Sequence, residues 1–160
     1  MNLSQAFGKL AQDKIAVRTR SFALNGHTFK VRVPLTSELD AMQERLKEPV
    51  IELEQKYYEQ LTKGLDENRE VLEKTEGIEV KDDDIIIEGR SLRELAKQKA
   101  LSERRIVEMF KILIPEDTSF DMNTITYDMI DELFPFSIQV EMMELISKTI
   151  SSDYKEIRGK

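Results

Sequence analysis

The fold is decided by two stretches that meet at Asn25-Gly26: Val17-Arg-Thr-Arg-Ser-Phe-Ala-Leu24 and His27-Thr-Phe-Lys-Val-Arg-Val33. An Asn-Gly pair suits the positive φ angles of a type I′ turn, whose twist matches that of a hairpin. Pairing across this turn sets Phe22 opposite Phe29. The sequence therefore predicts an antiparallel β-hairpin over residues 16–33.

The alternation of apolar and polar residues in this hairpin is imperfect. An uninterrupted ladder would place Arg18 and Arg20 on the apolar face and Val17 on the opposite face. One extra residue near Arg20–Ser21 would turn Val17 inward and both arginines outward. We therefore expect a β-bulge near Arg20–Ser21, and an unbroken ladder would contradict it.

The rest of the chain is predicted to be mostly helical. Leu3, Phe7 and Leu10 have helical spacing, which indicates either a short helix or an arm within residues 1–15. The further elements expected are helices over 36–76, short strands over 77–89, helices over 91–151 and a polar tail over 152–160.

Within the first helical region, we expect Pro49 to interrupt the helices and one charged helix to run from Val50 to about Lys74. Gly64 lies in its middle and weakens it by about 1 kcal/mol relative to alanine. The apolar stripe of this helix is narrow, so we expect it to project or to lie on a partner.

The second helical region is expected to start at a capping box, Ser91-Leu-Arg-Glu94, and to run to about Leu113. Residues 77–89 before it are either a second small hairpin or one strand beside the first hairpin. Asp82-Asp83-Asp84 is interpreted as an acidic turn, because it lacks the glycine and the terminal glutamate of a calcium-binding EF-hand loop.

The length and composition indicate one folded domain. The chain has 160 residues, with 24 Lys and Arg against 31 Asp and Glu, and a net charge of −7. No apolar run approaches the roughly 18 residues that a membrane span needs. We expect a single domain over residues 1–160, of the α+β class, mostly helical with a small antiparallel N-terminal hairpin or sheet.

The residue types exclude several classes of enzyme. Without cysteine the chain has no disulfide, no thiolate metal site and no cysteine nucleophile. His27 is the only histidine, so a multi-histidine metal site or a histidine-based triad would need a second subunit. We interpret His27 as a turn residue. We expect no enzymatic activity, no catalytic residue, no cofactor and no metal.

Charge is distributed unevenly along the chain. Residues 1–33 hold six basic residues and one acidic residue, a net charge of +5, which leaves −12 for the remainder. The basic hairpin could imitate a nucleic-acid-binding ribbon. However, Phe22 and Phe29 are its only strong apolar surface and belong in a core, and the acidic remainder would repel phosphates. Nucleic acid is therefore not the expected partner.

Methionines concentrate near the C-terminus. Met142 and Met143 are adjacent, so one helix cannot easily point both into its own core. We interpret Met129 and Met142 as core residues and Met143 as a partner contact, since flexible thioethers suit adaptable surfaces. The hypothesis for a partner-binding surface comprises Met142, Met143, Ile146, Tyr57 and Leu61.

Two stretches together resemble a known family. They are Phe22-Ala-Leu-Asn-Gly-His-Thr-Phe-Lys-Val-Arg-Val-Pro-Leu-Thr-Ser-Glu38, and Ile125-Thr-Tyr-Asp-Met-Ile-Asp-Glu-Leu133 with the closing Ser151-Ser-Asp-Tyr-Lys-Glu156. They resemble the two ends of the tail assembly chaperones of long-tailed, siphovirus-like bacteriophages. The resemblance covers roughly residues 16–47 and 124–160, and the charged segment 50–88 matches no pattern of that family.

The resemblance implies a non-enzymatic function. Proteins of this family coat the helical, aggregation-prone tape measure protein, recruit the major tail tube protein and are absent from the finished virion. The expected location is the host cell cytoplasm, and self-association is expected too. Two alternatives stay open: a structural virion protein such as a tail terminator or head–tail connector, and a small nucleic-acid-binding regulator that uses the basic hairpin.

Overall fold

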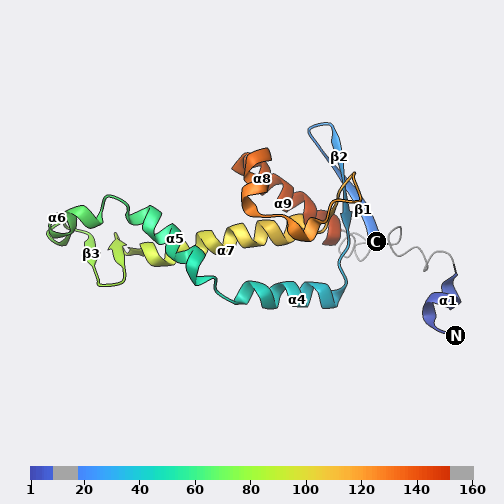
Figure 1. The fold of residues 1–160 in the computed structure, drawn as a ribbon, viewed down its shortest axis with the longest axis horizontal. Helices are drawn as coiled ribbons and strands as arrows, with labels where there is room; N and C mark the ends of the chain where they lie inside the picture. The colour runs from blue at the N-terminus through green and yellow to red at the C-terminus, as the bar shows by residue number, and fades with distance from the viewer. Residues whose placement is uncertain (9–17, 152–160) are drawn as a thin grey trace, which may run out of the picture. The chain divides into compact units, whose positions relative to one another are not determined.

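The computed structural model describes residues 1–8 and 18–151 (Figure 1). The fold is α+β and mostly helical with two small antiparallel sheets, as predicted. The chain divides into two compact units, the first formed by residues 1–42 and 106–160 and the second by residues 43–105. Two compact units can belong to one domain, so the single domain stays a prediction.

The first unit is built on a three-stranded antiparallel sheet. Its strands, in spatial order, are β1 (Thr19–Leu24), β2 (His27–Arg32) and β6 (Leu113–Ile114). The short helix α1 (Leu3–Phe7), the 3₁₀ turn η2 (Met122–Thr124), α8 (Tyr127–Leu133) and α9 (Phe136–Ser151) complete it. Two helices, α4 (Thr36–Lys47) and α7 (Leu92–Phe110), contribute residues to both units.

The hairpin forms in the predicted register. Phe22 lies opposite Phe29, and their rings stack with centroids 5.4 Å apart. Asn25 and Gly26 take φ angles of 51° and 79°, as a type I′ turn requires. The local turn chemistry thus sets the pairing of the whole hairpin.

The bulge expected near Arg20–Ser21 is wrong, because pairing runs unbroken over Thr19–Leu24. Arg20 stays on the face of Phe22 and donates a 2.9 Å hydrogen bond from Nη1 to the carbonyl oxygen of Thr149. The last carbonyls of a helix lack intrahelical partners and carry partial negative charge. A carbonyl at the end of α9 therefore accepts a hydrogen bond from Arg20. This bond allows an arginine at a position where the apolar–polar alternation of the strand predicts an apolar side chain. Val17 lies outside the described residues.

A second arginine contact fixes the start of α4. Glu38 accepts hydrogen bonds from Arg32 and, at 2.7 Å, from Arg18. The bond from Arg32 is the largest influence on the pKa of Glu38 and lowers it; burial opposes this, and Arg18 lowers it further. Both arginines flank the hairpin, so Glu38 ties the first turn of α4 to the strand ends.

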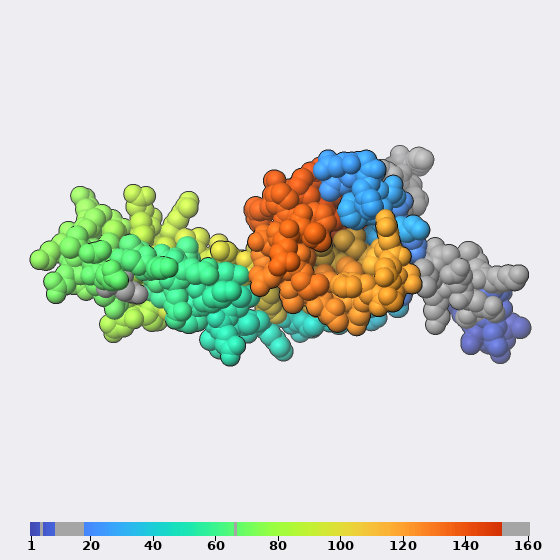
Figure 2. All heavy atoms as spheres, turned by 45° about the horizontal axis from the view of Figure 1, so that its top comes forward, coloured from blue at the N-terminus to red at the C-terminus, as the bar shows by residue number. Residues whose placement is uncertain are grey.

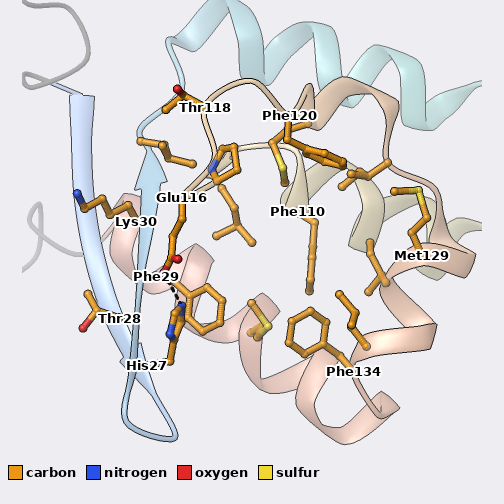
Figure 3. A pocket seen from close by; sticks show the side chains of 18 of the residues that line it. His27, Thr28, Phe29, Lys30, Phe110, Glu116, Thr118, Phe120, Met129 and Phe134 are labelled. Carbon is orange, nitrogen blue, oxygen red and sulfur yellow. Dashed lines mark ion pairs between the residues drawn. The ribbon is translucent and has the colours of Figure 1, made fainter.

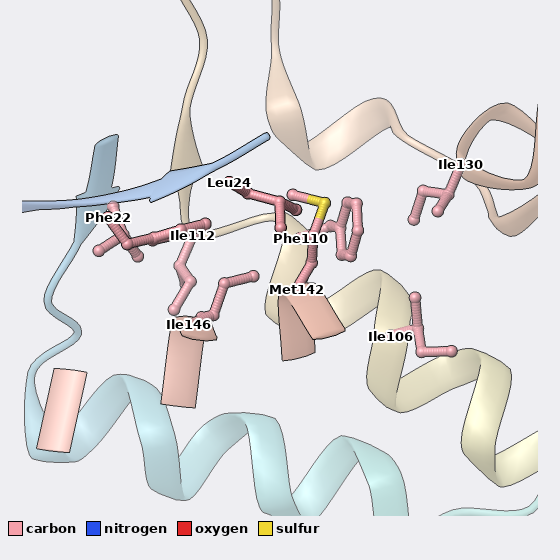
Figure 4. Close-up of a cluster of buried hydrophobic side chains, with 9 residues drawn as sticks. Phe22, Leu24, Ile106, Phe110, Ile112, Ile130, Met142 and Ile146 are labelled. Carbon is pink, nitrogen blue, oxygen red and sulfur yellow. The ribbon is translucent and has the colours of Figure 1, made fainter. Parts of the chain in front are cut away.

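The core of the first unit lies between the hairpin, α9 and the end of α7 (Figure 4). Val31, Met142 and Ile146 have no exposed surface. The helix predicted to run to Leu113 stops at Phe110 instead, since Leu113–Ile114 pairs with β2 as β6. The other buried members of this core are Phe22, Leu24, Ile106, Phe110, Ile112 and Ile130.

In the second unit, the break expected at Pro49 is confirmed, but the single helix from Val50 to about Lys74 is wrong. The chain forms α5 (Ile51–Thr62), the 3₁₀ turn η1 (Asp66–Asn68) and α6 (Arg69–Glu73). Gly64 lies at the break with a φ of 85°, in the left-handed region that residues with a Cβ disfavour.

Helix α5 packs within its own chain. Tyr57 is buried against Ala96 and Ala100 of α7, with Leu53 and Tyr58 partly buried beside them. The Tyr57 hydroxyl donates to the carboxylate of Glu103, which is also buried. The stripe therefore packs within the chain at Leu53 and Tyr57, so the helix does not project freely, whereas Val50 and Leu61 are each 40% exposed. The alternative, that the helix lies on a partner, stays a prediction.

The short strands form a separate sheet, β3 (Ile78–Val80), β4 (Ile85–Ile87) and β5 (Arg90–Ser91), which settles the two alternatives in favour of a second hairpin. Asp84 in the predicted acidic turn holds the start of α7. Its Oδ1 accepts the amides of Ile85 (2.8 Å) and Arg93 (2.9 Å), and its Oδ2 accepts the Ser91 hydroxyl. The Ser91 Oγ in turn accepts the Glu94 amide at 3.0 Å, which confirms the predicted cap.

The variant Gly64→Ala distinguishes the predicted continuous helix from the helix break that the structure has at this residue. In a continuous helix, Gly64→Ala would stabilise the protein by about 1 kcal/mol. At a φ of 85° the added Cβ has open space around it but strains the backbone, so we expect a loss of about 1–2 kcal/mol. Urea unfolding followed by circular dichroism measures the sign, and a gain in stability would contradict the break.

Asp84→Ala removes a carboxylate that accepts three hydrogen bonds, and we expect it to lower stability by about 0.5–2 kcal/mol, as for a lost helix cap. Burial would raise the pKa of Asp84, but the Ser91 hydroxyl, the two amides and the charge of Arg93 together lower it. Its stabilisation is therefore complete above the unfolded pKa of about 3.9 and is lost as the pH falls through the lower folded value. Asp82→Ala, at an exposed neighbour, is the control in urea unfolding at pH 7 and in acid. An equal loss in both variants would contradict the role of Asp84.

Candidate functional site

A cavity of about 720 Å³ opens on the surface of the first unit (Figures 2 and 3). One wall is β2, a second is the chain after Leu113, and a third is α8. In Figure 2 it is the hollow between the blue hairpin and the orange C-terminal part. Its volume lies within the roughly 300–1,000 Å³ typical of ligand pockets. We call it the apolar groove.

The floor of the apolar groove is the core itself. Phe110, Ile130 and Met142 line it, and each is at most 4% exposed. The rings of Phe110 and Phe134 meet edge to face with centroids 5.9 Å apart. A ligand in the groove therefore contacts side chains that are already fixed by packing.

The rim of the apolar groove is also apolar. Leu133 is 76% exposed, Phe120 43% and Met129 38%. Exposed apolar side chains gathered around an apolar hollow mark sites of protein interaction. The groove is therefore better suited to another chain's apolar side chains than to a polar metabolite.

Polar side chains also line the groove: Thr19, His27, Thr28, Lys30, Glu116 and Thr118. The Nε2 atom of His27 is 3.7 Å from Oε1 of Glu116, an ion pair when the imidazole is protonated (Figure 3). The imidazole also meets the ring of Phe29 edge to face at 4.5 Å. His27 directly follows the hairpin turn, as its interpretation as a turn residue requires. Because both members of the pair are largely exposed, the pair contributes little to the stability of the fold.

The described residues offer little for metal chemistry or for crossing a membrane. Across residues 1–8 and 18–151, no group of three or more histidines and carboxylates is placed to hold a metal ion. In the same part of the chain, no helix is both long and apolar enough to span a bilayer. The chemistry the groove provides is apolar contact with a few polar groups in its lining.

The five residues predicted to bind a partner fall in both units, three on α9 in the first and two on α5 in the second. Met142 and Ile146 have no exposed surface, and Tyr57 is 7% exposed against α7. Met143 is half-buried and packs on the core of the first unit, whereas Leu61, in the second unit, is 40% exposed. Partner binding by these residues stays a prediction; of the five, Met143 and Leu61 offer surface as folded, and Met142 alone lines the groove.

Sequence reasoning missed most of the groove. Met129, interpreted as a core residue, instead stands at the rim, and Leu133 and Phe120 were not singled out. One signal was available: Met129, Ile130, Leu133 and Phe134 are two apolar pairs on one short helical segment. At 3.6 residues per turn these four side chains form one wide apolar arc, and the core covers its Ile130 side while Met129 and Leu133 at the other border stay exposed.

Comparisons of the sequence with protein-family models and curated proteins, and of the fold with solved structures, find no match.

Oxidation of methionines tests the exposure of the rim. We expect dilute hydrogen peroxide to oxidise Met129 faster than Met142, because the thioether of Met129 reaches solvent and that of Met142 does not. Peptide mapping by mass spectrometry gives both rates. In denaturant the two rates should become equal, and equal rates in the folded protein would contradict the assigned rim and floor.

Proposed function

We propose that this protein is a non-enzymatic tail assembly chaperone. It binds the helical tape measure protein, keeps it soluble in the host cell cytoplasm and helps to recruit the major tail tube protein. The observation that carries the proposal is an apolar groove whose floor is rigid core and whose rim is exposed Leu133, Phe120 and Met129. The finished virion is not expected to contain the protein.

The resemblance to tail assembly chaperones supports the proposal because of where its residues lie. The N-terminal stretch, Phe22 to Glu38, includes β2, which forms one wall of the groove. The C-terminal stretch includes α8, which forms another. Segments from opposite ends of the sequence thus build the same groove.

An amphipathic helix is the occupant that fits such a groove. A helix places apolar residues at i, i+3, i+4 and i+7 along one face, and this face can lie in an apolar channel. Each Å² of apolar surface removed from water contributes about 25 cal/mol. Binding of this kind is independent of the exact partner sequence, as a protein that coats a long helical partner requires.

Charge around the groove indicates which helices it prefers. Residues 115–134 contain six acidic residues and no basic residue. Three of them, Asp128, Asp131 and Glu132, lie on the exposed side of α8, outside the lining of the groove, in which Glu116 is acidic and Lys30 is basic. Complementary charge speeds association and suppresses wrong partners. We therefore expect the bound helices to carry lysine or arginine beside their apolar face.

Co-expression with the tape measure protein, followed by affinity pull-down, tests the proposal. We expect the wild-type chain to bring the tape measure into the soluble fraction and to co-purify with it. Leu133→Asp should reduce the recovered tape measure at least tenfold, because a carboxylate at the rim would be desolvated by the bound helix. The matched control is Val71→Asp, whose side chain is 64% exposed in the second unit and does not line the groove.

Three outcomes would contradict the proposal. If the tape measure stays insoluble while the wild-type chain is abundant and folded, the protein is not its chaperone. If Leu133→Asp and Val71→Asp recover equal amounts of tape measure, the groove is not the binding surface. Recovery of the protein from purified virions would favour a structural component such as a tail terminator or head–tail connector.

A further inference from the structure

Helix α1 carries an apolar face that no other described residue covers. Leu3 is 73% exposed and Phe7 63%, and their i, i+4 spacing puts both on one side of the helix. The helix is closed by its own capping box, in which Asn2 Oδ1 accepts the Gln5 amide and Gln5 Oε1 accepts the Asn2 amide, each at 2.9 Å. A five-residue helix is marginal in water on its own, so α1 needs a surface to pack on.

The chemistry of α1 matches the apolar groove. The segment Leu3-Ser-Gln-Ala-Phe7 contains no charged side chain, so its insertion would bury no charge. The residues that connect it to β1 include Lys9 and Lys14 against Asp13, whereas residues 115–134 beside the groove carry six acidic charges, against which Lys30 is the basic lining residue. Docking would therefore bring an apolar face to an apolar surface and lysines to carboxylates.

The chain leading from α1 also ends at the groove. Thr19, the first residue of β1, is one of the residues that line it. Eleven peptide steps separate Gly8 from Thr19, and a chain of that length reaches at most about 40 Å. This limit on the separation of α1 from Thr19 favours contact within one chain over contact between chains.

We propose that α1 docks in the apolar groove of its own chain, with Leu3 and Phe7 against the apolar rim, and that an incoming partner helix displaces it. The identity of the competitor rests on the proposed function, but the docking itself does not. In this arrangement α1 covers the groove when no partner is present and so limits adventitious aggregation through Leu133, Phe120 and Met129.

A single tryptophan at position 7 tests the docking. The chain has no tryptophan, so Phe7→Trp introduces the only indole. We expect its emission maximum to lie well to the blue of free tryptophan and its acrylamide quenching to fall at least threefold. Adding Leu133→Asp to the same chain should return both values to those of an exposed indole, whereas adding Val71→Asp should leave them unchanged. Dilution over a hundredfold range should have no effect.

Each other result overturns the proposal. Solvent-like emission from Phe7→Trp alone means that α1 is not docked. Blue emission that survives both Leu133→Asp and a second rim variant, Met129→Glu, places α1 elsewhere. Loss of the blue shift on dilution assigns the contact to a second copy of the chain. Circular dichroism confirms that the variants are folded, and because no tape measure is present, failure here is distinct from failure of the proposed function.

Discussion

The packing of the N-terminal hairpin on the C-terminal helix is the contact on which the first unit depends. Val31 of β2 is fully buried in one core with Met142 and Ile146 of α9, and Arg20 of β1 donates to the carbonyl of Thr149. This contact joins segments more than a hundred residues apart. Both partners in the contact belong to the first unit, and the intervening residues 43–105 form the second.

The groove follows from how the sheet ends. Strand β6 pairs with β2 through Leu113 and Ile114, and the next residue is Pro115. Proline has no amide hydrogen, so the ladder cannot continue and the chain leaves the sheet. The start of β2, with His27 and Phe29, is thereby left facing a hollow that α8 borders on its other side. A binding surface arises here because two elements diverge over one core.

Features fixed by a few neighbouring residues could be predicted from the sequence. The Asn25-Gly26 turn set the hairpin register, and the Ser91 cap set the start of α7. The wrong predictions concern residues whose structure depends on long-range contacts or on the backbone preference of glycine. The alternation around Arg20 suggested a bulge because the carbonyl of Thr149 could not be foreseen. Gly64 was counted as a weak helical residue, although its positive φ ends the helix. The groove could not be predicted as a site, since its walls meet only in the folded chain.

The proposed binding of apolar helices, which does not depend on their exact sequence, needs some other source of selectivity. Docking of α1 would provide this selectivity. The apparent affinity of any competitor equals its intrinsic affinity multiplied by the fraction of chains whose groove is open. A short or weakly apolar segment would then be excluded, while a long helix with basic residues beside its apolar face gains both burial and charge pairing with the acidic segment around Asp128. Selection would then depend on the extent of the apolar face rather than on particular side chains, as the proposed binding of one long helical partner requires.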